Sequence, residues 1–179
     1  MANYYSPTVV QPSVPTSDMT NLEKYFLEAI FECKDVTEDG IDSIYFYSSE
    51  GVAQSIDFDE LVDTIEHLIE SDKRPSRLAD TLHDFIVNNE DASEFEVDDS
   101  VIEHVFQDIV RRSKTVKAII WTTSYTCDKM RPDGFGGSAV AITKNAIESA
   151  GTNRFISEFQ TRHGVKNLIE PVADDAPSP

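Results

Sequence analysis

Hydrophobic residues recur every three or four positions over four stretches of the chain, with polar and acidic residues between them. This is the 3.6-residue period of a helix that buries one side. The pattern predicts amphipathic helices over residues 20–33, 57–71, 75–86 and 98–110.

Start signals accompany these helices. Thr20 followed by Glu23 is a capping box, in which each residue bonds a free amide of the first turn. Asp57 followed by Glu60 resembles a second one, and Pro75 suits the first turn of the third helix. The boundaries of the helices are therefore predicted from two independent signals.

A different pattern, rich in β-branched and aromatic residues, predicts strands. Residues 35–42 are expected to be a loop that leads into a strand over residues 43–48. A turn at Glu50–Gly51 is expected to return the chain as a partner strand over residues 52–57. Together these segments predict a first β-hairpin.

The second predicted hairpin joins residues 115–127 to residues 138–143 through a long loop. A short helix is expected over residues 143–150, and another over residues 152–164 that ends at a glycine. The inward side chains of the last helix are expected to be Phe155, Ile156 and Phe159.

The element order predicts an α+β fold: one mixed, largely antiparallel sheet from two β-hairpins, packed against several amphipathic helices. Residues 1–17, with three prolines, are expected to be an extended or disordered arm, and residues 165–179 a flexible acidic tail. Residues 18–164 form a single domain in this interpretation. The order strand, connection, strand, helix occurs at residues 43–71 and again at residues 115–150, so a ββα pseudo-repeat is an open alternative to two hairpins in one sheet.

Charge changes the picture more than any motif. The chain has 33 acidic and 15 basic residues, a net charge of −18. From Asp18 to Val110 there are 26 acids and 5 bases, whereas Arg111 to Pro179 has 7 acids and 10 bases. A negative field of this strength repels nucleic acid and anionic membranes and attracts basic surfaces. We therefore expect no direct nucleic-acid or membrane binding.

The sequence predicts neither a metal site nor a catalytic residue. His67, His83 and His104 each stand beside a carboxylate, but the helical wheel places them away from the apolar stripes, and no metal-ligand pair spacing occurs. Cys127 is interpreted as a buried strand-end thiol rather than a nucleophile paired with His163. We expect no cofactor and lean against an enzyme. The start lacks a signal peptide, so a cytoplasmic protein with reduced cysteines is expected.

The loop at residues 128–137 is the best single site in the sequence. It holds three of the seven glycines, which predicts unusual backbone dihedrals there. Arg131, Asp133 and Phe135 are candidate interaction residues, because Arg and Phe are side chains that anchor interfaces. The structural alternative is equally weighted: a turn at Asp133–Gly134, with Phe135 in the core and Arg131 paired to a helix acid.

The stretch from Cys127 to Gly137, together with the opening from Asn3 to Pro12, resembles a group of small acidic proteins from bacterial plasmids and mobile elements. The group has no established activity, cofactor or site. The resemblance implies a bacterial, mobile-DNA context in which small accessory proteins act on host enzymes.

These features lead to one main hypothesis and two alternatives. The main hypothesis is an acidic binding or inhibitor protein that docks on a basic protein partner, in its sharper form a nucleic-acid mimic that blocks a nucleic-acid enzyme. The alternatives are a small-molecule binder or enzyme centred on the 128–137 loop, and a homo-oligomeric accessory subunit that exchanges its N-terminal arm. The candidate interaction residues of the second helix are Asp59, Glu60, Asp63, Glu66 and Glu70.

Overall fold

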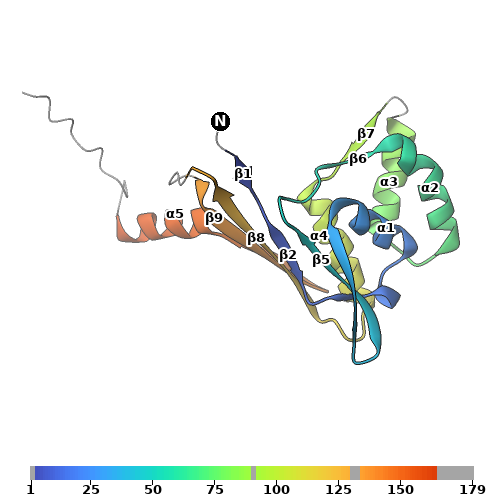
Figure 1. The fold of residues 1–179 in the computed structure, drawn as a ribbon, viewed down its shortest axis with the longest axis horizontal. Coiled ribbons are helices and arrows are strands. Elements are labelled where there is room, and N and C mark those ends of the chain that lie inside the picture. Colours follow the sequence, from blue (N-terminus) through green and yellow to red (C-terminus); the bar gives the residue numbers. More distant parts are fainter. Residues whose placement is uncertain (1–2, 90–91, 130–133, 165–179) are drawn as a thin grey trace, which may run out of the picture.

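The computed structural model describes residues 3–89, 92–129 and 134–164. In these residues the chain folds as α+β, as predicted, with a large antiparallel sheet and helices stacked on one face of it (Figure 1). No helix in the described ranges is long and apolar enough to cross a membrane.

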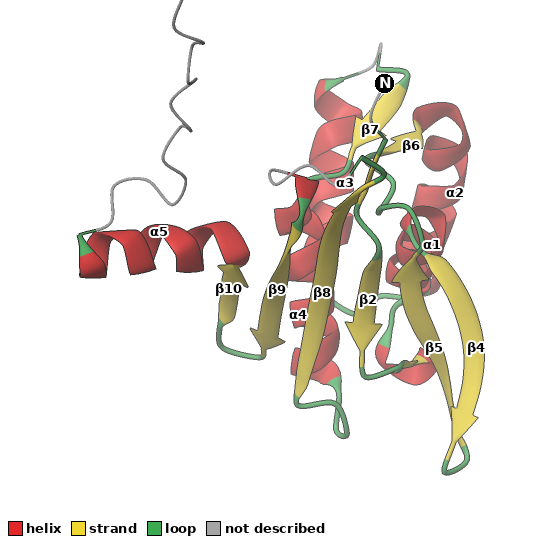
Figure 2. Ribbon diagram, turned by 60° about the vertical axis from the view of Figure 1, so that its left-hand side comes forward, coloured by secondary structure: helices red, strands yellow, loops and turns green. Residues whose placement is uncertain are grey.

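The large sheet has the strand order β10-β9-β8-β2-β5-β3, with β1 beside β8 and β4 beside β5. Every pairing described is antiparallel, so the sheet is not mixed. Figure 2 shows β10 at one edge and β4 at the other. The strands are β1 Tyr4–Tyr5, β2 Thr8–Gln11, β3 Val14–Pro15, β4 Glu32–Glu38, β5 Ile41–Ser48, β8 Ala118–Cys127, β9 Gly136–Thr143 and β10 Ile147–Gly151.

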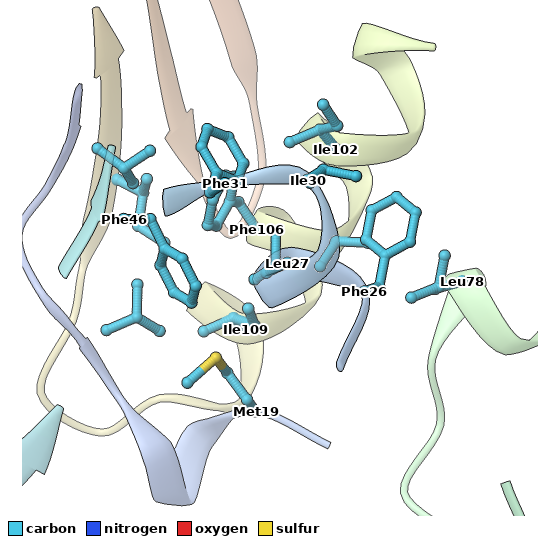
Figure 3. Packing of buried hydrophobic residues seen from close by; sticks show 14 of the residues in the cluster. Met19, Phe26, Leu27, Ile30, Phe31, Phe46, Leu78, Ile102, Phe106 and Ile109 are labelled. Atoms are coloured by element: carbon cyan, nitrogen blue, oxygen red, sulfur yellow. The ribbon is translucent and has the colours of Figure 1, made fainter. Parts of the chain in front are cut away.

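A second layer of helices buries the core against the sheet. It consists of η1 Thr16–Asp18, α1 Asn21–Ile30, α2 Phe58–Ser71, α3 Arg77–Asn88 and α4 Asp99–Arg112. Helix α5, Thr152–His163, has no buried residue and lies outside this layer, beyond the β10 edge of the sheet (Figure 2). The core centre is aromatic: the ring of Phe31 lies 6.0 Å from that of Phe46 and 6.1 Å from that of Phe106 (Figure 3). Helices α1 and α4 contact the sheet, while α2 and α3 pack outside them.

Local capping explains where two helices begin. The Thr20 hydroxyl accepts the Glu23 amide at 3.1 Å, and the Glu23 carboxylate accepts the Thr20 amide at 2.9 Å, which confirms the predicted capping box. Asp98 caps α4 by accepting the Ser100 amide at 2.7 Å. These bonds satisfy amides that have no partner inside the helix.

The first predicted hairpin is wrong in its pairing. Residues 35–42 are not a loop: β4 and β5 form a long hairpin whose turn is Asp39 (φ 52°) and Gly40 (φ 78°). Asp-Gly is the preferred pair for a two-residue turn with both φ angles positive. Instead of pairing with β5, residues 55–57 form β6, which pairs with β7, Glu94–Glu96, in a separate two-stranded ribbon.

The N-terminal residues differ from the expected arm. Strand β2 lies inside the sheet between β8 and β5, and Val10 and Val14 are fully buried. Proline interrupts a strand only at a position whose amide would donate a hydrogen bond to the neighbouring strand. Pro7 and Pro12 lie just before and just after β2, so they leave its hydrogen bonds intact. The prolines therefore mark the strand's ends, and the segment pairs with β5 and β8 of its own chain. Exchange of this segment between two copies stays a prediction.

The C-terminal part carries two further corrections. Residues 147–151 are strand β10 rather than part of a helix, because Thr143 closes a turn: its hydroxyl accepts the Ala146 amide at 3.1 Å, and its own amide donates to the Ala146 carbonyl at 2.8 Å. With neither ββα unit formed, the pseudo-repeat is wrong. Helix α5 has the predicted bounds, but its apolar residues do not point inward. Their exposed fractions are 70% for Phe155, 38% for Ile156 and 42% for Phe159.

Candidate functional site

Exposed carboxylates between Glu28 and Asp99 form what we call the acidic surface. They lie on the end of α1, the β4–β5 hairpin, the segment after it, the last turn of α2, the outer side of α3, and the β6–β7 ribbon with the start of α4. Its members are Glu28, Glu32, Asp35, Glu38, Asp39, Asp42, Glu50, Asp57, Glu70, Asp80, Asp84, Glu94, Glu96, Asp98 and Asp99.

The β6–β7 ribbon displays its acids on one face. Ser55 is opposite Glu96 and Asp57 is opposite Glu94, whereas the intervening pair, Ile56 and Phe95, is buried in the core. Because side chains alternate across a strand, the apolar pair fixes the carboxylates on the outer face. The ribbon is thus a rigid support for a row of negative charges.

The start of α4 brings three further acids together. Hydrogen bonds from the Ser100 side chain and amide lower the pKa of the N-cap, Asp98. Partial burial, with the Asp98 charge added, raises the pKa of Asp99. Partial burial and the charges of Asp99 and Asp98 raise the pKa of Glu103. Like charges crowd here, and a cation brought to this place would relieve the repulsion.

Two arginines near the acidic surface, Arg77 and Arg112, form ion pairs with buried carboxylates and not with the acidic surface. Arg112 pairs with the fully buried carboxylate of Glu23, which also accepts the Ser76 hydroxyl at 2.8 Å. Arg77 pairs with Asp108 at 2.8 Å. Burial alone would raise the pKa of Asp108, but hydrogen bonds from Arg77 outweigh it and lower the pKa.

Several predicted interaction residues cannot be placed at side-chain level. Arg131 and Asp133 lie outside the described residues, and so do the side chains of four acids in α2: Asp59, Glu60, Asp63 and Glu66. Glu70 is exposed on the last turn of α2, and Phe135 is 43% exposed beside β9. Phe135 therefore does not plug the core, which removes that part of the structural alternative.

Phe135 lines an aromatic groove of about 470 Å³. Its wall comes from β1, β8, the start of β9 and the first turn of α5, and includes Tyr4, Tyr5, Tyr125 and Ile156. Pairing of Tyr4 with Cys127 and of Tyr5 with Thr126 brings these distant segments together. The groove was missed from the sequence, although the adjacent Tyr4 and Tyr5 were its visible signal.

The glycines beside the groove permit close approach rather than unusual dihedrals. A Cβ atom on Gly134 would lie 2.4 Å from the Cβ of Cys127, which no real structure tolerates without movement. None of Gly134, Gly136 and Gly137 has a positive φ, so the expectation of special backbone angles is wrong there. The glycines hold the loop's end against β8.

A smaller cleft of about 260 Å³ lies between the sheet and the start of α4. Its hydroxyl groups bond one another: Thr8 to Thr123 at 3.0 Å, and Tyr125 to Ser138 at 3.0 Å, while the Trp121 indole donates to Thr123 at 3.0 Å. These are mutually satisfied contacts of the kind that fix strands. Asp99, whose pKa is raised by partial burial, also lines this cleft.

Metal and thiol chemistry find little support in the described ranges. No group of three or more His, Cys, Asp or Glu side chains there is arranged to hold a metal ion. His67, His83 and His104 are exposed, as the helical wheel predicted. Cys127 is buried, as predicted, whereas Cys33 is exposed on β4, and both are free thiols.

Comparison with known proteins adds no relative. No family model, no curated protein and no solved structure matches the chain. The resemblance to plasmid-borne acidic proteins therefore stays a prediction, and the function has to be argued from the surface itself.

Proposed function

We propose that the protein is an acidic binding protein that docks on a basic surface of a protein partner, and that a nucleic-acid-binding enzyme is the class of partner its charge favours. The partner's cationic groove, built for phosphates, would accept the acidic surface in place of nucleic acid. Docking would then block the groove sterically and electrostatically.

One observation carries the proposal: most of the described acids of residues 18–110 are exposed, whereas Arg77 and Arg112 are paired with the two buried ones. Exposed carboxylates occupy the hairpin, the ribbon and α3, and Arg77 and Arg112 are held by Asp108 and Glu23. A surface that only needed solubility would be served by mixed charges of both signs.

Regular spacing supports the sharper form, a nucleic-acid mimic. On a strand, residues two apart share a face and lie roughly 6.7 Å apart. Glu94 and Glu96 have this relation on β7, with Asp57 alongside Glu94 on β6. Evenly repeated negative charges on a rigid support are what a phosphate-binding groove is built to receive.

The test is a titration of the whole protein into basic nucleic-acid enzymes, such as a nuclease, by calorimetry at low salt. Affinity should fall as salt rises, because exposed charges are screened beyond about 10 Å at 0.1 M ionic strength. The single variant Glu96→Gln should weaken binding several-fold. Glu148→Gln, outside the acidic surface on β10, is the matched control.

Two outcomes of this titration would contradict the proposal. Undetectable affinity for every basic enzyme at low salt would remove it. Equal loss of affinity in the Glu148→Gln control would show that net charge, and not the acidic surface, governs binding.

A second candidate function rests on the aromatic groove beside Phe135. Concave sites of this size, lined by aromatic side chains with a few polar groups, bind small planar molecules. Indole is a suitable probe: titration should shift the nuclear magnetic resonance signals of Tyr125 and Ile156, and Phe135→Ala should reduce the shift. Unmoved signals at saturating indole would reject this function.

A further inference from the structure

Strand β10 is a sheet edge with outward-facing backbone groups. Hydrogen-bonded and non-bonded pairs alternate along an antiparallel ladder. The bond from the Thr143 amide to the Ala146 carbonyl fixes the phase, so Ile147, Ser149 and Gly151 turn their N–H and C=O groups away from β9. Arg154 Nη1 lies 3.5 Å from the Ser149 carbonyl oxygen, which agrees with this direction.

The β10 edge also lacks the usual protection against pairing. Natural edge strands are blocked by lysines, prolines, bulges or charges. The opposite edge, β4, follows this rule with Glu32, Lys34, Asp35 and Glu38. Strand β10 consists of Ile-Glu-Ser-Ala-Gly, with one charge and small residues at its centre.

Helix α5 extends beyond this edge and leaves a groove beside it. Figure 2 shows α5 leaving the end of β10 and running outward, past the position that a next strand would occupy. The groove measures about 670 Å³ and is lined by β10 together with Arg154, Phe155 and Glu158. Phe155 is the most exposed large apolar side chain described, at 70%.

The charge around β10 and α5 indicates which molecule could occupy the groove beside β10. Two copies of a chain with net charge −18 repel each other over the acidic surface. Residues 144–164 carry three bases, Lys144, Arg154 and Arg162, and two acids, Glu148 and Glu158. This part of the molecule is nearly neutral, so a second copy meets less repulsion here than over the acidic surface.

We propose that β10 and α5 form the interface of a homodimer. Strands β10 of two copies pair antiparallel about a two-fold axis at Ser149, so that Ser149 bonds Ser149 of the partner subunit and Ile147 bonds Gly151 of the partner subunit. Arg154 gives up the Ser149 carbonyl to the new strand. Helix α5 of each copy then covers the added strand with Phe155. Such an isologous contact closes on itself and stops at two subunits.

The test measures molecular mass by sedimentation equilibrium over a concentration series, with 20.0 kDa as the monomer value. The natural chain should approach twice this mass. Ser149→Pro removes an outward amide that the monomer does not need, so it should leave the fold intact and keep the mass at one subunit. Ser149→Ala, which keeps the amide, is the matched control and should remain dimeric.

A second variant guards against loss of folding. Phe155→Ser should raise the dimer dissociation constant at least tenfold, whereas Val87→Ser, a 60% exposed apolar residue on α3, should leave it unchanged. A chain that stays monomeric at all concentrations overturns the proposal. So does a Ser149→Pro variant that is folded and still dimeric, or a Phe155→Ser variant that dimerises like the natural chain.

Salt separates this interface from partner binding. Screening weakens the repulsion between two acidic copies, so the dimer should tighten as salt rises, while docking on a basic partner should weaken. The salt dependence of dimerisation tests the strand pairing, and the salt dependence of partner binding tests the proposed function, so each can fail without the other. A dimer that weakens with salt would mean that charge attraction holds it, which contradicts the strand pairing proposed here.

Discussion

Two regions of the molecule are built in opposite ways. One is the acidic half, which consists of α1 to α4 and the β6–β7 ribbon. The other is the C-terminal wing, which consists of β9, β10 and α5. In the half, aromatic side chains from α1, α4 and the sheet meet in the core, and buried ion pairs tie the helices together (Figures 1 and 3). In the wing, α5 touches the sheet near its first turn and exposes its apolar residues. Helices α1 to α4 bury their apolar sides against one another and against the sheet, and β9 joins this core through Ile142. The apolar side chains of α5 remain exposed to solvent.

The largest expected effect lies in the buried network of the acidic half. Glu23→Ala would leave Arg112 without its partner and remove acceptors for the Thr20 amide and the Ser76 hydroxyl. Breaking a buried ion pair costs about 3–5 kcal/mol. Urea unfolding measures it, and Glu28→Ala, an exposed acid on the same helix, is the control. A loss below about 1 kcal/mol would show that the network contributes little.

Gly134→Ala tests a tightly packed contact between the residues before β9 and the end of β8. Its new methyl group would lie 2.4 Å from the Cβ of Cys127. Overpacking of this kind costs about 1–3 kcal/mol. Gly40→Ala is a different control, since it adds strain from its positive φ but meets no atom within 4 Å. If the thermal unfolding temperature of Gly134→Ala equalled that of the natural chain, the contact between residue 134 and Cys127 would have room for a methyl group.

How well the sequence predicts the molecule differs between the two regions. In the acidic half, long periodic stretches and the capping box at Thr20 predicted where helices lie, because helix signals are local. Strand partners were wrong for residues 43–57, since part of the pairing energy comes from distant chain segments, here β2 for β5 and β7 for residues 55–57. The Asp39–Gly40 turn was a local signal that was overlooked.

The candidate site was less predictable still. The surplus of acids was evident from the composition. The sequence did not show which of these acids are exposed and which are paired with arginines. The spacing of residues does not indicate that Arg112 pairs with Glu23, or Arg77 with Asp108, inside the fold. The aromatic groove joins Tyr4 to Phe135 through a two-residue strand. In the wing, the amphipathic pattern of α5 predicted a buried face, yet periodicity says only that a face is apolar and not what covers it.

Asp72 gives a smaller effect that depends on pH. Hydrogen bonds from the Arg74 side chain lower the pKa of Asp72 from 3.8 to about 2, and Arg74 also donates to the Ser17 carbonyl at 2.8 Å. A depressed folded pKa stabilises the protein above pH 3.8, and this stability is lost as pH falls toward about 2. Since the pair is partly solvated, Asp72→Asn should cost about 1 kcal/mol at pH 7 and almost nothing at pH 2.

The measurement is unfolding free energy against pH, with Asp80→Asn, an exposed acid on α3, as control. The curve of Asp72→Asn should be flatter than that of the natural chain between pH 5 and pH 2, while Asp80→Asn should follow the natural curve. Parallel curves for all three proteins would mean that the Arg74 contact does not persist in solution.

The smallest expected effect compares the same residue type in the two regions. Phe106 is fully buried in α4, and Phe106→Ala should cost about 3–5 kcal/mol because it leaves a cavity. Phe159 on α5 is 42% exposed, and its ring lies tilted against that of His163 with ring centres 4.5 Å apart. In a monomer, Phe159→Ala should change the unfolding free energy by no more than about 0.5 kcal/mol, as expected for a surface substitution. The experiment therefore needs the Ser149→Pro background, where β10 cannot pair. Stability loss that appears only when Ser149 is present would belong to the interface, whereas an equal loss in both backgrounds would mean that α5 packs within its own chain.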